Sequence, residues 1–136
     1  MKPAWVLLWV IATTAPGTMQ EKSLIGDFTK SPTEHIINRI EQPFVVRTVK
    51  GIVVEKGGWQ ESLPGVLFEI QGPDTGRKIR TGTTDQRGRF RIGHVPLGTY
   101  KFKATLNGFE SVMGSIIVSK KARKTDEIKV EMRVGV

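Results

Sequence analysis

Residues 83–110 constrain the fold more than any other stretch, because apolar and charged residues alternate there on both sides of a short loop that contains Pro and Gly. Such alternation places successive side chains on opposite faces of a β-strand, one face buried and the other in water. The residues expected to be buried are Phe90, Ile92, Tyr100, Phe102 and Ala104, and those expected in solvent are Arg89, Arg91, Lys101 and Lys103. The stretch therefore predicts a β-hairpin.

Two turns frame this predicted hairpin. Asp85 and Gly88 bracket the first, since Asp accepts hydrogen bonds from backbone N–H groups two residues on and Gly adopts a positive φ without a steric clash. The connection between the strands contains Pro96 and Gly98, residue types that interrupt strands. We expect these residues to have structural roles.

Five other segments show strand-like patterns, at residues 44–55, 66–71, 78–84, 111–119 and 127–134. Gly51 interrupts the first of them, and a Gly inside a strand often marks a bulge or the close approach of another backbone. With the two strands of the hairpin, these segments make seven short strands without a long helix. That number and spacing predict a β-sandwich.

The N-terminus has the layout of a secretory signal peptide. Lys2 precedes an uncharged apolar run over residues 4–12, and small residues follow up to Gly17. The run is about half the roughly 20 residues that a membrane-spanning helix needs, so we expect no membrane span. A buried N-terminal helix is the alternative. Residues 1–17 thus predict export, to the periplasm, the cell envelope or the medium.

Residues 18–43 form a polar segment that we interpret as a linker with a short amphipathic helix. Ser31 and Glu34 have the spacing of a helix capping box, and Pro32 suits the first helical position. Three isoleucines then share one helical face, and Pro43 ends the pattern. The helix is interpreted either as part of the linker or as an arm that binds a partner.

Residues 84–109 resemble the carboxypeptidase regulatory-like family, whose domains are transthyretin-like β-sandwiches. The resemblance is carried by Thr84, Asp85, Gly88, Arg89, Phe90, Pro96, Leu97, Gly98, Thr99, Tyr100, Gly108 and Phe109. It extends over about residues 48–134 and implies an accessory module of the kind attached to peptidases, outer-membrane receptors or surface proteins. We therefore predict an all-β, seven-stranded antiparallel Greek-key sandwich at residues 44–136, after the signal peptide and the helical linker.

Nothing in the sequence points to catalysis. The chain has no Cys, and its two histidines, His35 and His94, lack the carboxylate and hydroxyl partners of a nucleophilic triad. A transthyretin-like enzyme that hydrolyses 5-hydroxyisourate ends in Tyr-Arg-Gly-Ser, whereas the sequence here reads Met132, Arg133, Val134, Gly135, Val136. Asp85 is an isolated acid, and calcium needs several oxygen ligands along a loop. We expect no enzyme, no cofactor and no metal site.

The formal net charge of +8 favours either an anionic partner or a solvated basic surface. If the strands of the predicted hairpin are neighbours, Arg89, Arg91, Lys101 and Lys103 form one cationic cluster able to hold phosphate or carboxylate groups. Nucleic-acid binders usually interleave exposed aromatic residues for base stacking, and none is interleaved here. Acidic glycans, lipid headgroups or an envelope protein are therefore preferred to nucleic acid.

Trp59 lies in a Gly-rich loop, where it either stacks on a sugar or folds back over the end of the core. Three functions remain open. The first is an exported binding module for carbohydrate or cell-envelope components that uses Trp59 and the cationic cluster. The second is a structural partner of a larger envelope or receptor complex, docked by residues 31–42 or by an edge strand. The third, a small hydrolase, is disfavoured because no site supports it.

Overall fold

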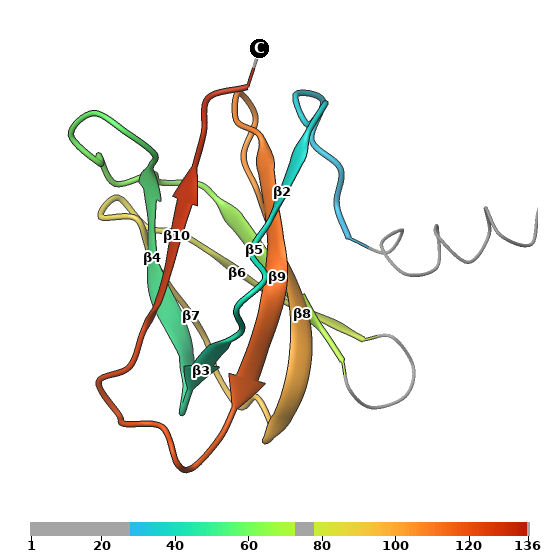
Figure 1. Cartoon of the computed structure of the whole chain (residues 1–136), viewed down its shortest axis with the longest axis vertical. Coiled ribbons are helices and arrows are strands. Elements are labelled where there is room, and N and C mark those ends of the chain that lie inside the picture. Colours follow the sequence, from blue (N-terminus) through green and yellow to red (C-terminus); the bar gives the residue numbers. More distant parts are fainter. Residues whose placement is uncertain (1–27, 73–77, 136) are drawn as a thin grey trace, which may run out of the picture.

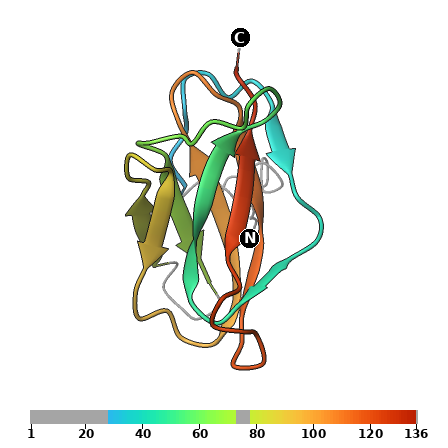
Figure 2. The same cartoon turned by 90° about the vertical axis from the view of Figure 1, so that its left-hand side faces the viewer.

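Nine β-strands and no helix make up the part of the protein that the structure, a computed structural model, describes, namely residues 28–72 and 78–135. The strands form two sheets stacked as a β-sandwich (Figures 1 and 2). The all-β prediction is confirmed, with two more strands than expected. The predicted signal peptide and the start of the linker lie outside the described residues. The described residues contain no helix that is long and apolar enough to cross a membrane.

The larger sheet has six strands in the order β2-β9-β8-β5-β6, with β3 also paired to β9. These strands are β2 (Ile37–Arg39), β3 (Phe44–Val46), β5 (Leu67–Gln71), β6 (Ile79–Thr83), β8 (Gly98–Thr105) and β9 (Ser111–Val118). The pairs between β5, β6, β8 and β9 are antiparallel, whereas β2 and β3 both run parallel to β9. The purely antiparallel arrangement predicted from the sequence is therefore wrong at this edge.

The smaller sheet has three strands in the order β10-β4-β7. They are β4 (Val49–Glu55), β7 (Arg89–Ile92) and β10 (Ile128–Met132), and β10 runs parallel to β4. The predicted strand 44–55 is thus two strands, since β3 belongs to one sheet and β4 to the other. Gly51 marks the predicted close approach of a backbone, because it pairs with Ile128 and an added Cβ would overlap the Ile128 carbonyl.

The predicted hairpin over residues 83–110 is wrong, although its pattern of burial is right except at Lys103, which is buried. β7 pairs with β4 in the smaller sheet, and β8 pairs with β5 and β9 in the larger one. The intervening loop therefore crosses from one sheet to the other. It contains His94 with a φ of 57°, and the Tyr100 hydroxyl donates a hydrogen bond of 2.6 Å to the Pro96 carbonyl. Gly98 begins β8 after this crossing.

The amphipathic helix predicted within residues 18–43 is also wrong. The Ser31 N–H does donate to the Glu34 carboxylate at 2.7 Å, as in a capping box, but the chain makes only a turn there. It then extends as β2 and pairs with β9 from Ile37 to Arg39. Pairing with an existing sheet edge supplies this short segment with backbone hydrogen bonds, whereas a helix of its length is only marginally stable alone.

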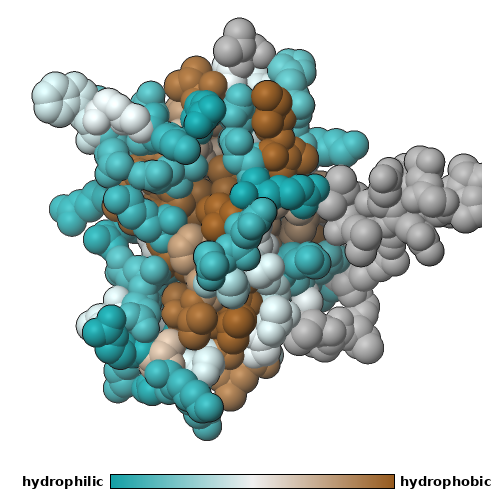
Figure 3. All heavy atoms as spheres, in the orientation of Figure 1, coloured by the Kyte–Doolittle hydropathy of each residue, from teal (hydrophilic) through white to brown (hydrophobic). Residues whose placement is uncertain are grey.

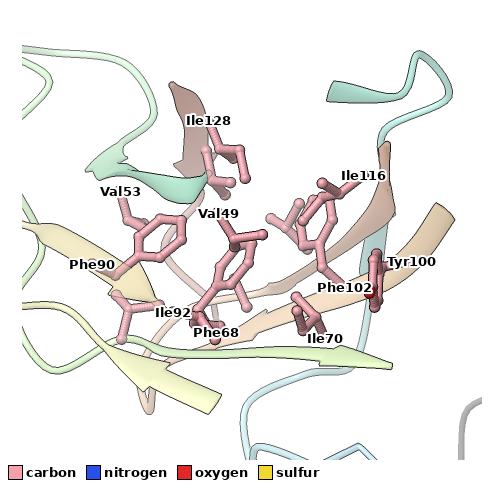
Figure 4. Close-up of a cluster of buried hydrophobic side chains, with 14 of the residues drawn as sticks. Val49, Val53, Phe68, Ile70, Phe90, Ile92, Tyr100, Phe102, Ile116 and Ile128 are labelled. Carbon is pink, nitrogen blue, oxygen red and sulfur yellow. The ribbon is translucent and has the colours of Figure 1, made fainter. Parts of the chain in front are cut away.

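The core lies between the sheets and consists of the alternate residues that the period-two patterns identify (Figure 4). Phe68 of β5 lies at its centre, with its ring centroid 4.1 Å from that of Phe90 and 5.0 Å from that of Phe102. Val66, Phe68 and Ile70 are fully buried, as are Ile128, Val130 and Met132. Aromatic and branched side chains from both sheets thus fill the interior, as in other sandwiches.

The turn between β6 and β7 has the predicted form. Asp85 Oδ1 accepts hydrogen bonds from the N–H groups of Arg87 and Arg89 at 2.8 and 3.0 Å, and Gly88 has a φ of 75°. The N–H groups of Arg89 and Arg87 hold the pKa of Asp85 below its ordinary range, because they stabilise the charged carboxylate. Asp85 is therefore occupied in shaping the turn.

Candidate binding surface

Trp59 is the most exposed large apolar side chain among the described residues, with 93% of its surface accessible. It lies at the tip of the loop between β4 and β5, which is closed at its base by the bridge between Val54 and Ser62. The Gln60 N–H donates to the Gly57 carbonyl at 3.1 Å and forms the turn at the tip. The alternative in which Trp59 folds over the core is therefore wrong.

Gln60 fastens this loop to the outer face of the smaller sheet. Its Nε2 donates to Glu131 Oε2 at 2.8 Å, and Lys129 Nζ donates to its Oε1 at 3.2 Å. Both partners belong to β10. The side-chain amide of Gln60, next to Trp59, is thus bound through both its nitrogen and its oxygen, which ties the tip of the loop to β10.

A cleft of about 470 Å³ lies beside this anchor and is lined by residues of β10 and β2, among others. The sheets are close at their other edge, where Gly82 of β6 packs directly against the backbone of Arg91 in β7. The cleft is lined by four cationic residues, Arg39, Lys56, Lys129 and Arg133. Among the described residues that line it, one is acidic, Glu131. Ile40, half-buried, and Val112, buried, give it an apolar base.

The predicted cationic cluster does not form. Arg89 and Arg91 lie on β7 in the smaller sheet, whereas Lys101 and Lys103 lie on β8 in the larger one. Lys103 is only 2% exposed. The error follows from the wrong hairpin, because alternation shows which face a residue occupies but leaves its neighbouring strand open.

Arg89 and Arg91 have different neighbours from those expected. Arg91 lies opposite Lys50 of β4, and Arg89 pairs with Glu127 at 3.2 Å. The sequence did not identify Lys50 as a neighbour of Arg91, because no local signal indicates that β4 and β7 are partners. These cations, with Asp85 and Glu127, surround a shallower hollow of about 350 Å³ in which acids and cations are nearly balanced.

Lys103 belongs instead to a buried polar network that fastens residues 28–34 across the outer face of the larger sheet. Its Nζ donates to Glu34 Oε2 at 2.8 Å, with side chains 3% and 9% exposed, and Ser111 Oγ donates to Glu34 Oε1 at 2.8 Å. Nearby, the Thr29 N–H and hydroxyl donate to the Glu69 carboxylate at 2.9 and 3.1 Å. This network is structural, and it removes Lys103 from any ligand surface.

The network sets the titration of Glu34. Burial raises its pKa, but hydrogen bonds from Lys103, the Ser31 N–H and Ser111 outweigh burial and hold the pKa below its ordinary value of 4.5. A carboxyl group with a depressed pKa stabilises the fold fully above its unfolded pKa, and that stability is lost as the pH falls through the folded value.

We therefore expect the stability gap between the wild type and Glu34→Gln to be constant above about pH 5 and to shrink on acidification below that. Urea unfolding of both proteins from pH 6 to pH 2.5 measures it, and the Glu34 carboxyl carbon should titrate below 4.5 by NMR. A gap that stays unchanged over the whole range would mean that Glu34 titrates normally.

The described residues contain no arrangement suited to metal binding or to nucleophilic catalysis. No group of three His, Asp or Glu side chains converges in them. His35 and His94 are both exposed and lie outside the strands. The pocket beside His94 contains Arg47 and Arg91 but no described acid that would orient an imidazole.

Comparison with protein-family models gives a match to the carboxypeptidase regulatory-like domain over residues 48–133. A search of curated proteins finds no match. The matched region begins one residue before β4 and ends one residue after β10, so it contains all of the smaller sheet and most of the larger one. Domains of this description are β-sandwich modules and are generally non-catalytic. On its motifs, its fold and this match, the chain belongs to the carboxypeptidase regulatory-like domain family.

Proposed function

We propose that this protein is an exported, non-catalytic accessory module that recognises carbohydrate of the cell envelope through the loop that carries Trp59. The observation that supports this most is the 93% exposure of an indole whose loop is fastened to β10 by Gln60. An exposed Trp offers a large, rigid, amphipathic contact surface at a low cost in conformational entropy. Stacking of its ring on the apolar face of a sugar would remove that surface from water.

The export part of this proposal rests on residues 1–17, which have the charged, apolar and small-residue regions of a signal peptide. The periplasm, the cell surface and the medium all expose the module to polysaccharide. The same locations keep nucleic acid out of reach. In agreement with this, the aromatic residues that alternate with the cations of β7 and β8, Phe90, Tyr100 and Phe102, are buried and cannot stack on bases.

Trp59→Ala is expected to weaken binding to the preferred glycan by about tenfold or more, since aromatic anchors of this kind carry much of the energy of an interface. Binding to a glycan and polyanion array at low and moderate salt measures this. Leu97→Ala is the matched control, because it removes a 54% exposed apolar side chain from the loop between β7 and β8. Equal binding by both variants, or a blank array, would refute the proposal.

The second candidate is docking to a larger envelope or receptor assembly through an edge strand. Residues 31–42 are engaged with β9 and with Lys103, which leaves β3 as the apolar edge of the larger sheet. Val45 on this strand is 47% exposed, and edge strands pair readily with a strand of another protein. A blank array combined with specific retention of an envelope protein would favour this function.

A further inference from the structure

We propose that the cleft between β10 and β2 binds the acidic groups of an anionic polysaccharide, so that the glycan recognised at Trp59 is an acidic one. This inference rests on the proposed function, because Trp59 and the cleft would contact the same ligand. It assigns the cleft to the carboxylate or sulfate groups and the indole to a sugar ring. The charges, the shape and the position of the cleft each support it.

The charges at the cleft are unbalanced. Four cationic side chains face one carboxylate, that of Glu131, which already accepts a hydrogen bond from Gln60. Among the described residues, no hydrogen bond or ion pair engages the side chains of Arg39, Lys56 or Arg133. Cations gathered around one cavity repel each other and create a positive potential that an anion would neutralise.

The shape and lining of the cleft suit a sugar better than a bare ion. Its volume of about 470 Å³ falls within the range of roughly 300–1,000 Å³ that is common for small-molecule sites. Ile40 and Val112 supply an apolar base. The Asn38 Nδ2 donates a hydrogen bond to Glu110 at 2.9 Å. The Oδ1 of the same side chain is an acceptor and is suited to accept a hydrogen bond from a sugar hydroxyl group.

Figure 3 shows the same face of the molecule as Figure 1, with apolar atoms in its middle and hydrophilic side chains around and over them. This alternation of apolar surface and charge matches a polysaccharide, whose rings have apolar faces and whose acidic groups project from them. A free phosphate would use the charges alone, and a flat lipid surface would not enter a cleft to reach its apolar residues.

The cleft is continuous with the Trp59 loop through Gln60. Both of the hydrogen bonds that Gln60 makes reach residues of the cleft wall, Glu131 and Lys129. Lys56, another wall residue, begins the same loop, and its N–H donates to the Met132 carbonyl at 2.7 Å. One extended chain can therefore contact the indole and the cations together.

The hollow on the smaller sheet is a weaker candidate for the same ligand. Lys50, Arg89 and Arg91 line it, but so do Asp85 and Glu127, and Arg89 is already paired with Glu127 at 3.2 Å. Its potential is correspondingly smaller, and it lies away from the anchor of the Trp59 loop. Arg91, a cation of this hollow, therefore serves as a control position.

The test compares two oligosaccharides that differ in charge, an unesterified oligogalacturonate and its methyl-esterified form, with a heparin-derived oligosaccharide as the sulfated probe. The double variant Lys56→Gln/Arg133→Gln removes two cleft cations. The double variant Arg91→Gln/Lys101→Gln removes two exposed cations elsewhere and gives the same net charge. Calorimetric titration of the full chain, with Trp59→Ala in parallel, measures each affinity.

The wild type is expected to bind an acidic oligosaccharide at least about tenfold more tightly than the methyl ester. The cleft variant should lose this preference and keep its affinity for the ester, while the control variant keeps the preference. Retention of the preference in the cleft variant, or equal loss in both variants, would overturn the inference. Loss of ester binding in Trp59→Ala alone would then leave the proposed function standing.

Absence of oligosaccharide binding by the wild type would overturn the inference together with the proposed function. If anionic vesicles or an extended peptide then bound in a manner that required Lys56 and Arg133, the cleft would belong to a membrane surface or to a protein strand. Either result would contradict the assignment to a polysaccharide.

Discussion

Lys103→Met is expected to lower the free energy of unfolding by about 3–5 kcal/mol, the usual cost of leaving one partner of a buried ion pair without the other. Glu34 would remain almost buried, and Ser31 and Ser111 would be its remaining hydrogen-bond donors. Residues 28–34 would also lose a fastening to the larger sheet. Urea unfolding at pH 7 measures the change.

Lys101→Met is the matched control, because it makes the same replacement on the same strand at an exposed position, where changes are usually within about 0.5 kcal/mol. The double variant Glu34→Met/Lys103→Met should recover much of the lost stability, since an apolar pair of similar volume often replaces a buried ion pair without loss. Equal, small effects at positions 101 and 103 would show that the network contributes little.

Gly51→Ala, which adds one methyl group in β4, is expected to lower the free energy of unfolding by on the order of 4 kcal/mol. The new Cβ would overlap the carbonyl of Ile128, which belongs to the backbone of β10 and cannot rotate away. Relief requires β10 to move from β4, and that would break the parallel pairing and uncover Val130 and Met132.

Gly93→Ala is the control for this prediction. A Cβ at Gly93 would contact nothing within 4 Å, and its φ is not in the left-handed region. Its replacement should be neutral or slightly stabilising, because alanine restricts the unfolded chain more than glycine. Thermal unfolding of both variants gives the comparison. A loss at Gly51 no larger than that at Gly93 would mean that β10 adjusts without cost.

Local patterns were sufficient to predict the composition of the core and the main turn. Period two identified Phe90 and Ile92 on β7 and Tyr100 and Phe102 on β8, because strands in a sandwich have one buried face. The turn at Asp85 was predictable because both of its hydrogen bonds are made within a few residues. These features depend on neighbours in the sequence.

The features that could not be predicted depend on distant partners. Lys101 and Lys103 occupy equivalent places in the alternation, yet Lys103 is buried because residues 28–34, far away in the sequence, cross over it. Residues 31–40 have a helical pattern, but Ile37 and the two residues after it pair with the edge of β9 instead. The exposure of Trp59 has no sequence signal, since a Gly-rich loop permits either orientation.

The pairing of β10 with β4, and of β2 and β3 with β9, has a consequence for how the protein folds. Each of these parallel pairs joins an early strand to a late one, as in the partnership of Gly51 with Ile128 and of Ile37 with Ser111. The larger sheet is incomplete until β9 has been synthesised and the smaller one until β10 has, so β2, β3 and β4 each lack a strand partner until then. Parallel pairing over such separations is slow to form. Such late completion of the sheets is compatible with the export proposed above, because a secretion channel accepts an unfolded chain.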